Sequence, residues 1–249
     1  MINVLIPMAG QGSRFAKEGY EKPKPFIDVD GKPMIERIIN NLKIPNANYI
    51  LIARQEHLDR EKELKSYLEK EYGVKFIVCK KLTEGTACTA LLAYDEINNE
   101  QPLLIANSDQ LVNLDINEFL NDAKSRKLDG SILTFKDEEL NPKWSFAKID
   151  KSSYVTEVRE KEAISEHATV GIYLFNKGSE FIRSAVQMIV NNDRVNNEFY
   201  TCPVYNYSIK SGAKIGIYDI KMADMHGIGT PQDLNKFLEN EDKDIIFQI

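Results

Sequence analysis

The chain opens with the stretch INVLIPMAGQGSR, residues 2–14, in which a short apolar run leads directly into a glycine-rich turn and an arginine. The apolar part, Ile2–Pro7, has the length and the β-branched content of a buried strand. Glycines directly after a strand let the backbone approach a phosphate and point its N–H groups at the oxygens. The stretch therefore predicts a strand followed by a phosphate-binding turn, a combination that flavin and NAD enzymes also use.

Strands and helices alternate through the rest of the first half. The expected strands are Tyr49–Ala53, Lys75–Val78 and Leu103–Ala106, and the expected helices are Met34–Leu42, Leu58–Tyr72 and Thr86–Ile97. This alternation implies right-handed crossovers and a mostly parallel sheet. We predict an α/β protein whose residues from about 1 to 112 form a nucleotide-binding half.

After Asp109 the pattern changes to more strands with fewer helices between them. The expected strands are Ser131–Phe135, Phe146–Ile149, Tyr154–Val158, Thr169–Phe175 and Lys214–Tyr218, and the expected helices are Gly178–Val190, Tyr205–Ser211 and one from Pro231. We predict a mixed sheet here, in a smaller acceptor-binding part spanning about 113–249. No repeat or linker divides the chain, so we expect one domain.

The composition excludes some classes of binding partner and some cellular locations. The net charge of −6 disfavours nucleic acid and anionic membranes, which bind an excess of Lys and Arg. The three cysteines (Cys79, Cys88, Cys202) show no metal or disulfide spacing. The first apolar run is too short for a signal peptide, and no segment approaches the roughly 18 apolar residues of a membrane helix. We expect a soluble cytoplasmic protein, and the sequence leaves open whether it forms a homo-oligomer.

A cationic segment, Glu21–Phe26, follows the turn. Arg14 can hold a phosphate with two parallel hydrogen bonds, and Lys24 adds a point charge fixed between two prolines. Nucleotidyl transfer depends on such positioned charge more than on covalent chemistry. We predict catalytic roles for Arg14 and Lys24, and we interpret Lys22 as a surface lysine.

A carboxylate is expected at the same edge of the sheet. The buried strand Leu103–Ala106 ends in Asn107-Ser108-Asp109-Gln110, which puts Asp109 where open α/β sheets bind ligands. Asp109 can hold Mg²⁺, a hard ion that bridges substrate phosphates. The alternative is an aspartate that caps a turn.

With four later segments in the same order, these features resemble the sugar-phosphate nucleotidylyltransferases, which make nucleotide-diphospho-sugars on a Rossmann-like, three-layer GT-A fold. The four segments are Glu84–Ala90, Val158–Lys161, Val170–Phe175 and His226–Pro231. The resemblance spans residue 4 to about 235. It implies that a nucleoside triphosphate and a sugar 1-phosphate, or a related phosphorylated acceptor, give a nucleotide-diphospho-sugar and pyrophosphate, with Mg²⁺ as cofactor.

The resemblance also implies site residues. Nucleotide contacts are expected at Met8, Ala9, Gly10, Gly12, Ser13, Arg14, Glu84, Gly85, Thr86 and Ser108, beside the catalytic Arg14, Lys24 and Asp109. Acceptor contacts are expected at Glu160, Lys161, Gly171, Tyr173 and Glu198. Lys161 lies in a charged run, so a solvated lysine is the alternative there. A synthetic role in a surface-polysaccharide pathway is the expected context.

One position departs from the family pattern. The closing turn usually carries an aspartate as second magnesium ligand, and this chain has Gly227 there. Asp224 could substitute for it, water could fill the gap, or His226 could take a different role. We name Asp109 and Asp224 as the metal ligands.

Three other functions stay open. A GT-A glycosyltransferase would use a nucleotide-sugar and usually shows two aspartates where this chain has Asn107-Ser108-Asp109. A Rossmann oxidoreductase would need a third glycine at Phe15. A non-catalytic nucleotide-sugar-binding protein would bind without releasing pyrophosphate. Neither the base nor the acceptor can be chosen from the sequence.

Overall fold

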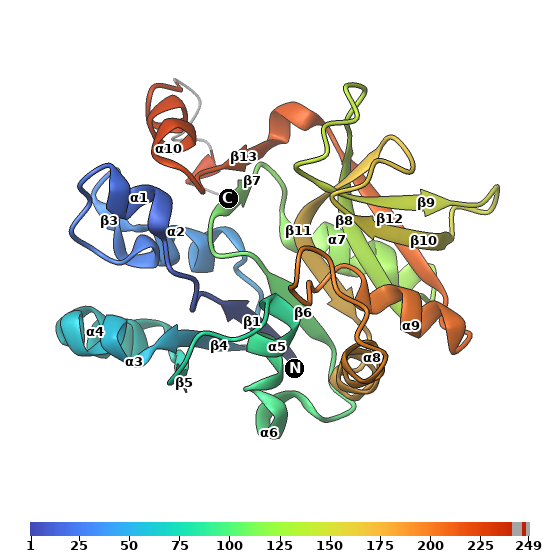
Figure 1. Ribbon diagram of the computed structural model, residues 1–249, viewed down its shortest axis with the longest axis horizontal. Coiled ribbons are helices and arrows are strands. Elements are labelled where there is room, and N and C mark those ends of the chain that lie inside the picture. The colour runs from blue at the N-terminus through green and yellow to red at the C-terminus, as the bar shows by residue number, and fades with distance from the viewer. Residues whose placement is uncertain (241–245, 248–249) are drawn as a thin grey trace.

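A mixed nine-stranded sheet runs through both halves of the molecule (Figure 1). The computed structural model describes residues 1–240 and 246–247. Four strands run parallel in the order β5 (Lys75–Cys79), β4 (Ala47–Arg54), β1 (Ile2–Pro7) and β6 (Leu103–Ala106). This half of the sheet has the strand order of a Rossmann-like fold, as expected.

The second half of the sheet is built around β11 (His167–Phe175), which runs antiparallel to β6. β11 also pairs with β8 (Gly130–Lys136) and β9 (Ser145–Ile149). The outer strands are β10 (Val155–Glu160) beside β9 and β12 (Ile215–Ile220) beside β8. The mixed sheet predicted for this half is confirmed.

Helices cover both faces and give three layers. One face packs α1 (Ser13–Lys17), α2 (Met34–Asn41), α3 (Gln55–Arg60), α4 (Lys62–Tyr72), α7 (Ile116–Ser125) and α10 (Pro231–Leu238). The other packs α5 (Thr86–Leu91), α6 (Tyr94–Ile97), α8 (Gly178–Val190) and α9 (Val204–Lys210). The first strand explains why: Val4 and Ile6 enter one core and Leu5 the other, because side chains alternate along a strand.

Two helical predictions need correction, and two helices, α1 and α7, have no counterpart among the predictions. The helix expected at Leu58–Tyr72 is two helices, because the backbone at Glu61 leaves the helical region (φ −119°, ψ 46°). The helix expected at Thr86–Ile97 also breaks, into α5 and α6. α7 was not expected at all, although Asp115 caps it by accepting a hydrogen bond from the Asn117 N–H.

The topology brings the functional segments together. The loops after β1 and β6 leave from neighbouring strands, at the point where the strand order reverses and α/β sheets bind ligands. After η1 (Lys24–Phe26), the strands β2 (Asp28–Val29) and β3 (Lys32–Pro33) form a small hairpin. Near the end of the chain, η2 (Met222–Asp224) leads into β13 (Met225–Gly227), which pairs with β7 (Gln110–Val112).

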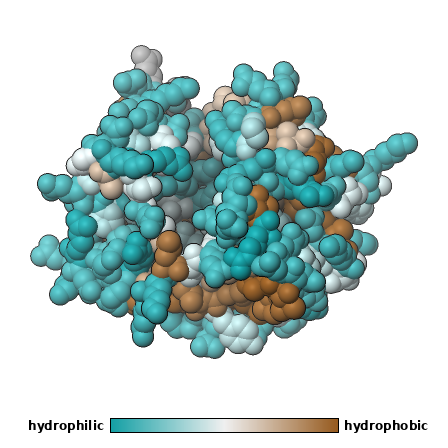
Figure 2. Space-filling model, in the orientation of Figure 1, coloured by the Kyte–Doolittle hydropathy of each residue, from teal (hydrophilic) through white to brown (hydrophobic). Residues whose placement is uncertain are grey.

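The molecule is hollowed between its halves, and the rim of the hollow is largely hydrophilic (Figure 2). Within the described residues, no helix combines the length and apolar character needed to span a bilayer.

Candidate active site

The glycine-rich turn after β1 forms one wall of a cavity of about 450 Å³. Gly12 has a left-handed backbone (φ 61°), and a Cβ there would lie 3.1 Å from the Cβ of Lys24. The turn therefore packs directly against η1, which carries that lysine. The predicted residues that line this cavity are Met8, Gly10, Gly12, Ser13, Arg14, Lys24, Thr86, Ser108, Asp109 and Glu198. Ala9 is instead buried in the core behind the turn.

At the foot of the turn, Lys24 and Asp109 form an ion pair. The two side chains are 19% and 25% exposed, so a ligand can reach both. Gly229 lies against this pair: a Cβ there would lie 2.6 Å from Asp109 Oδ2 and 3.5 Å from Lys24 Nζ. The Ile228 N–H also donates to the Asp109 carbonyl at 2.8 Å. The turn at Ile228 and Gly229 thus holds Asp109 in position. Only a glycine fits at position 229 without a movement of Asp109.

A second cavity, of about 710 Å³, adjoins the first and shares Arg14, Asp109 and Gly229 with it. Gly227 and His226 lie on its wall. A Cβ at Gly227 would meet no atom within 4 Å, so the space of the missing family aspartate is open. Burial lowers the pKa of His226, which keeps its imidazole neutral near pH 7.

Asp224 is not among the residues that line the second cavity. Its neighbours Ala223 and Met225 line the second cavity, whereas its own carboxylate accepts a hydrogen bond from the Asn113 side chain at 3.4 Å. The role of Asp224 as a metal ligand stays a prediction. In the part of the chain that the structure describes, no cluster of three or more His, Cys, Asp or Glu side chains could hold a metal.

The turn before α5 is covered by a segment from the other half. The Phe199 N–H donates to the Glu84 carbonyl at 2.7 Å, and the Phe199 carbonyl accepts from Ala87 N–H at 2.9 Å. Gly85 (φ 121°) lies under the Phe199 backbone, where any Cβ would collide. Thr86 reaches the first cavity, and its hydroxyl oxygen accepts from the Thr201 N–H at 3.1 Å. Of the three predicted residues here, Thr86 is on the cavity wall, Gly85 is the close-packing point, and the Glu84 carboxylate pairs with Arg194 at 2.5 Å.

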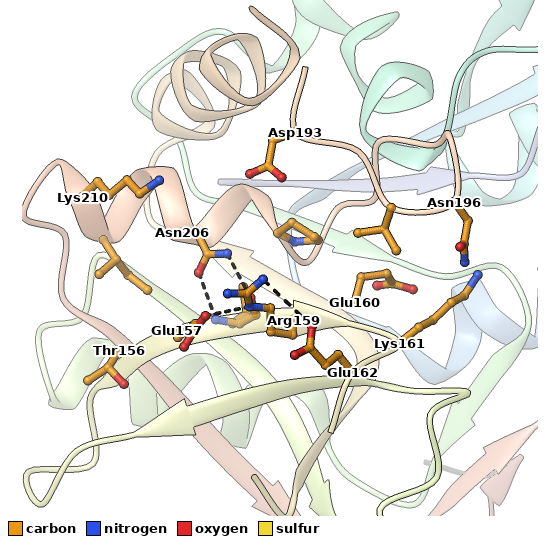
Figure 3. Close-up of a pocket in the computed structure, with 14 residues that line it drawn as sticks. Thr156, Glu157, Arg159, Glu160, Lys161, Glu162, Asp193, Asn196, Asn206 and Lys210 are labelled. Atoms are coloured by element: carbon orange, nitrogen blue, oxygen red, sulfur yellow. Dashed lines mark hydrogen bonds and ion pairs between the residues drawn. The ribbon is translucent and has the colours of Figure 1, made fainter. Parts of the chain in front are cut away.

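Glu160 and Lys161 lie at one end of a third cavity, of about 670 Å³, along β10 (Figure 3). Glu160 accepts a hydrogen bond from Ser145, and burial raises the pKa of its carboxyl. Lys161 has a left-handed backbone (φ 57°), and its ammonium donates to Tyr200 OH at 2.8 Å. This hydrogen bond raises the pKa of Lys161, which stays a cation. Lys161 is thus an exposed cation whose ammonium is held by Tyr200.

Two predicted acceptor residues are packed inside the protein. Tyr173 is only 5% exposed, and its hydroxyl bonds Thr169 Oγ1 at 3.1 Å. Gly171 (φ 94°) lies beneath the hydrogen-bonded side chains of Asn107 and Gln110, which a Cβ would strike. The strand pattern placed these residues on the correct strand but could not tell which side chains faced a ligand. Their roles as acceptor contacts stay predictions.

The structure adds residues that the sequence did not single out. Gly229 was visible in the Gly-Thr-Pro turn, although its contact with Asp109 was not. Tyr200 and Arg194 carried no local motif, because their importance comes from Lys161 and Glu84, which are far away in the sequence.

Comparisons with known proteins identify the family. The model of the nucleotidyl transferase family matches residues 3–220. A mannose-1-phosphate guanylyltransferase catalytic subunit beta from Dictyostelium discoideum is 25% identical over 178 residues, 70% of this chain and 50% of that protein. The chain thus spans about half the length of that curated relative.

Solved structures show the same fold. A nucleoside-diphosphate-sugar pyrophosphorylase from Vibrio cholerae superimposes with a TM-score of 0.79 at 24% identity, over 95% of this chain and 100% of the other. An inositol-1-phosphate CTP transferase from T. maritima gives 0.72 at 15% identity, over 98% and 94%. Together with the match over residues 3–220, these findings show that the chain belongs to the nucleotidyl transferase family.

Proposed function

We propose that this protein is a nucleotidylyltransferase that joins a nucleoside triphosphate to a sugar 1-phosphate or a related phosphorylated acceptor and releases pyrophosphate. The observation that carries the proposal is the Lys24–Asp109 pair at the foot of the glycine-rich turn, with Arg14 beside it on both adjoining cavities. The names of the relatives support a triphosphate and a phosphorylated acceptor, and they differ in base and acceptor.

In the proposed reaction, a phosphate oxygen of the acceptor attacks the α-phosphorus in line. A new P–O bond forms as the bond to the β-phosphate oxygen breaks, and pyrophosphate leaves with the bonding electrons. No protein nucleophile is needed, so the protein would accelerate the reaction by positioning the substrates and stabilising their charge. The amides of Gly10–Ser13 and the Arg14 guanidinium would hold the β- and γ-phosphates. Lys24 would neutralise charge on the α-phosphate, and Lys161 would hold the acceptor's phosphate.

The residues present fit a magnesium ion. Asp109 offers a hard, accessible carboxylate where the first two cavities meet. Mg²⁺ is often held by one or two carboxylates together with substrate phosphates and several waters, so a cluster of protein ligands is not required. When bound there, Mg²⁺ would offset the negative charge of the phosphates.

The two substrates would bind to different halves of the chain. Residues from about 1 to 112 would bind the triphosphate, and those from about 113 to 249 the acceptor, with Glu198 reaching across to the first cavity. Because the cell makes nucleoside triphosphates in the cytoplasm, we place the reaction there, with surface-polysaccharide synthesis as the use of its product.

A pyrophosphate-release screen tests the proposal. CTP, UTP, dTTP and GTP are each incubated with MgCl₂ and with mannose 1-phosphate, glucose 1-phosphate, inositol 1-phosphate or a phosphorylated amino alcohol. We expect release for at least one pair and none from a Lys24→Ala variant. Release of a nucleoside diphosphate from a nucleotide-sugar would favour a glycosyltransferase, and tight binding with no pyrophosphate from any pair would favour a binding protein.

A further inference from the structure

A single segment of the acceptor half, residues 191–201, borders two of the cavities. Asp193, Val195 and Asn196 line the third cavity, along β10, and Glu198 lines the first, beside the glycine-rich turn. We call this segment the bridge. Any movement of the bridge would therefore change the walls of both cavities at once.

The far end of the bridge is joined to the nucleotide half by backbone bonds. Phe199 pairs with the carbonyl of Glu84 and with the N–H of Ala87. Two residues on, the Thr201 hydroxyl bonds Thr86 Oγ1 at 3.0 Å. The turn that opens α5 and the bridge therefore form one hydrogen-bonded unit made from both halves.

The near end of the bridge is a tight turn with an unusual backbone, closed by reciprocal backbone hydrogen bonds between Val195 and Glu198. Asn192, Asn196 and Asn197 all have positive φ angles (53°, 50° and 64°). Such conformations cost energy for residues other than glycine, least for asparagine, so they persist where other contacts fix them. Besides these backbone bonds, a side-chain contact from within the bridge also holds this part in shape.

Arg194 provides that contact. Its neighbours in sequence face the third cavity, whereas its guanidinium turns to Glu84 and forms an ion pair at 2.5 Å. The guanidinium also lies 4.2 Å from the centre of the Phe199 ring. Arg194 further donates to the Asn192 side chain at 2.6 Å and to the Asn197 carbonyl at 3.3 Å. One side chain thus fixes the bridge internally and fastens it to the nucleotide half.

A surface ion pair by itself contributes little to folding stability. With 31% and 64% of their side chains exposed, Arg194 and Glu84 are not essential to the core. Their effect would fall on the bridge, because a planar guanidinium can hold several partners in a fixed arrangement.

We propose that Arg194 is a positioning residue. Through its contact with Glu84 it makes the acceptor-side and nucleotide-side walls move together, so that binding of one substrate strengthens binding of the other. This inference rests on the proposed function for the identity of the two substrates. The coupling is reciprocal, because each substrate must change the affinity of the other by the same factor.

Calorimetry tests the coupling. The non-reacting α,β-methylene analogues of CTP, UTP, dTTP and GTP are titrated with MgCl₂, each with and without saturating mannose 1-phosphate, glucose 1-phosphate or inositol 1-phosphate. In the wild type we expect the acceptor to raise the affinity of one analogue. In Arg194→Gln and Glu84→Gln this factor should fall about fivefold or more towards one. The charge-reversed double variant E84R/R194E should recover part of it. The inference is overturned if Arg194→Gln keeps the wild-type factor.

The matched control is Lys75→Gln. Lys75 and Glu96 form another exposed ion pair at 2.5 Å, joining β5 to α6 away from the cavities. Its removal should leave the coupling factor unchanged. If Lys75→Gln lowered the factor as much as Arg194→Gln, a general effect of lost surface charge would replace our explanation.

Hydrogen exchange separates this inference from the proposed function. In Arg194→Gln, amides in Glu84–Ala87 and in Glu198–Thr201 should exchange faster by a similar factor, while those of β1 stay protected. Unchanged exchange in Glu84–Ala87 would contradict the inference, whatever the protein binds. A wild type that binds no analogue and releases no pyrophosphate would refute the proposed function, and the exchange result would still decide the role of Arg194.

Discussion

Lys24 and Asp109 lie 85 residues apart in the sequence and form an ion pair where the loops after β1 and β6 meet. Within the described residues, this is the one ion pair that either side chain forms. Both side chains stay partly exposed, so a ligand carrying phosphate and a cation could replace each partner with a matching charge.

The first prediction concerns this pair. Lys24→Met or Asp109→Asn should lower the rate of pyrophosphate release by about a hundredfold or more, because a positioned charge at the reacting phosphate is lost. The melting temperature should change little, since both side chains lie at the surface of a cavity. Lys22→Met is the control: this exposed lysine is two residues away and should retain activity. Equal rates for the Lys24 and Lys22 variants would contradict the assignment.

Gly229 gives the second prediction. In Gly229→Ala the new methyl would lie 2.6 Å from Asp109 Oδ2, so the carboxylate must move off its present position. We expect turnover to fall at least about tenfold with the fold retained, because a small misplacement of a positioning group is costly. Gly227→Ala adds the same methyl two residues earlier in open space and should behave as wild type. Steady-state kinetics and circular dichroism of both variants provide the comparison.

The third prediction uses the open space at Gly227. Gly227→Asp should fold normally and place a second carboxylate on the cavity that Asp109 lines. More carboxylate ligands bind a divalent cation more tightly, so half-maximal activity should need several-fold less MgCl₂. Gly227→Asn has the same shape without the charge and should keep the wild-type dependence. Identical magnesium curves for the Asp and Asn variants would show that this position does not face the ion.

Glu160 leads to a pH-dependent prediction. Burial raises the pKa of its carboxyl above the ordinary 4.5, and the Ser145 hydrogen bond and Lys161 only partly oppose this. Between the ordinary and the raised value the native protein binds more protons than the unfolded chain, so this group's contribution to stability falls as pH rises across that window. Glu160→Gln removes this group, so its contribution no longer falls as pH rises. The melting temperature of the variant, relative to wild type, should therefore rise from about pH 4 to about pH 7.

The exposed Glu162 provides the control for that experiment, since it lies two residues further along the same segment. Glu162→Gln should show no comparable rise relative to wild type. If the melting temperature of Glu160→Gln, relative to wild type, stayed flat or fell with rising pH, the prediction would be wrong. The ionised Glu160 carboxylate would then not destabilise the native protein.

The nucleotide half of the fold was predictable because its signals are local. Four buried apolar runs gave the parallel strands, and the glycine-rich turn and Asp109 follow two of them directly. The same local reading failed at α7, where a capping aspartate and a buried face at Ile116, Phe119 and Ala123 were present but overlooked.

The acceptor half was less predictable for a physical reason. All nine residues of β11 are buried, so alternation along the strand does not distinguish a side chain facing a cavity from one facing the core. For this reason the pattern places Tyr173 and Gly171 on this strand but does not show which way they face. Arg194 could not be found at all, because a pair with Glu84 across the two halves leaves no mark in either local sequence.

The pairing of β13 with β7 bears on how the protein reaches its working form. Gly229 reaches Asp109 only after the last strand has docked onto a segment from the middle of the chain. Contacts between residues so distant in sequence close large loops and tend to form late. In a refolding chain, the glycine-rich turn after β1 would thus form first. The contact of Gly229 with Asp109 would form last. Triphosphate binding should return earlier than pyrophosphate release, with a delay set by the arrival of a single short strand.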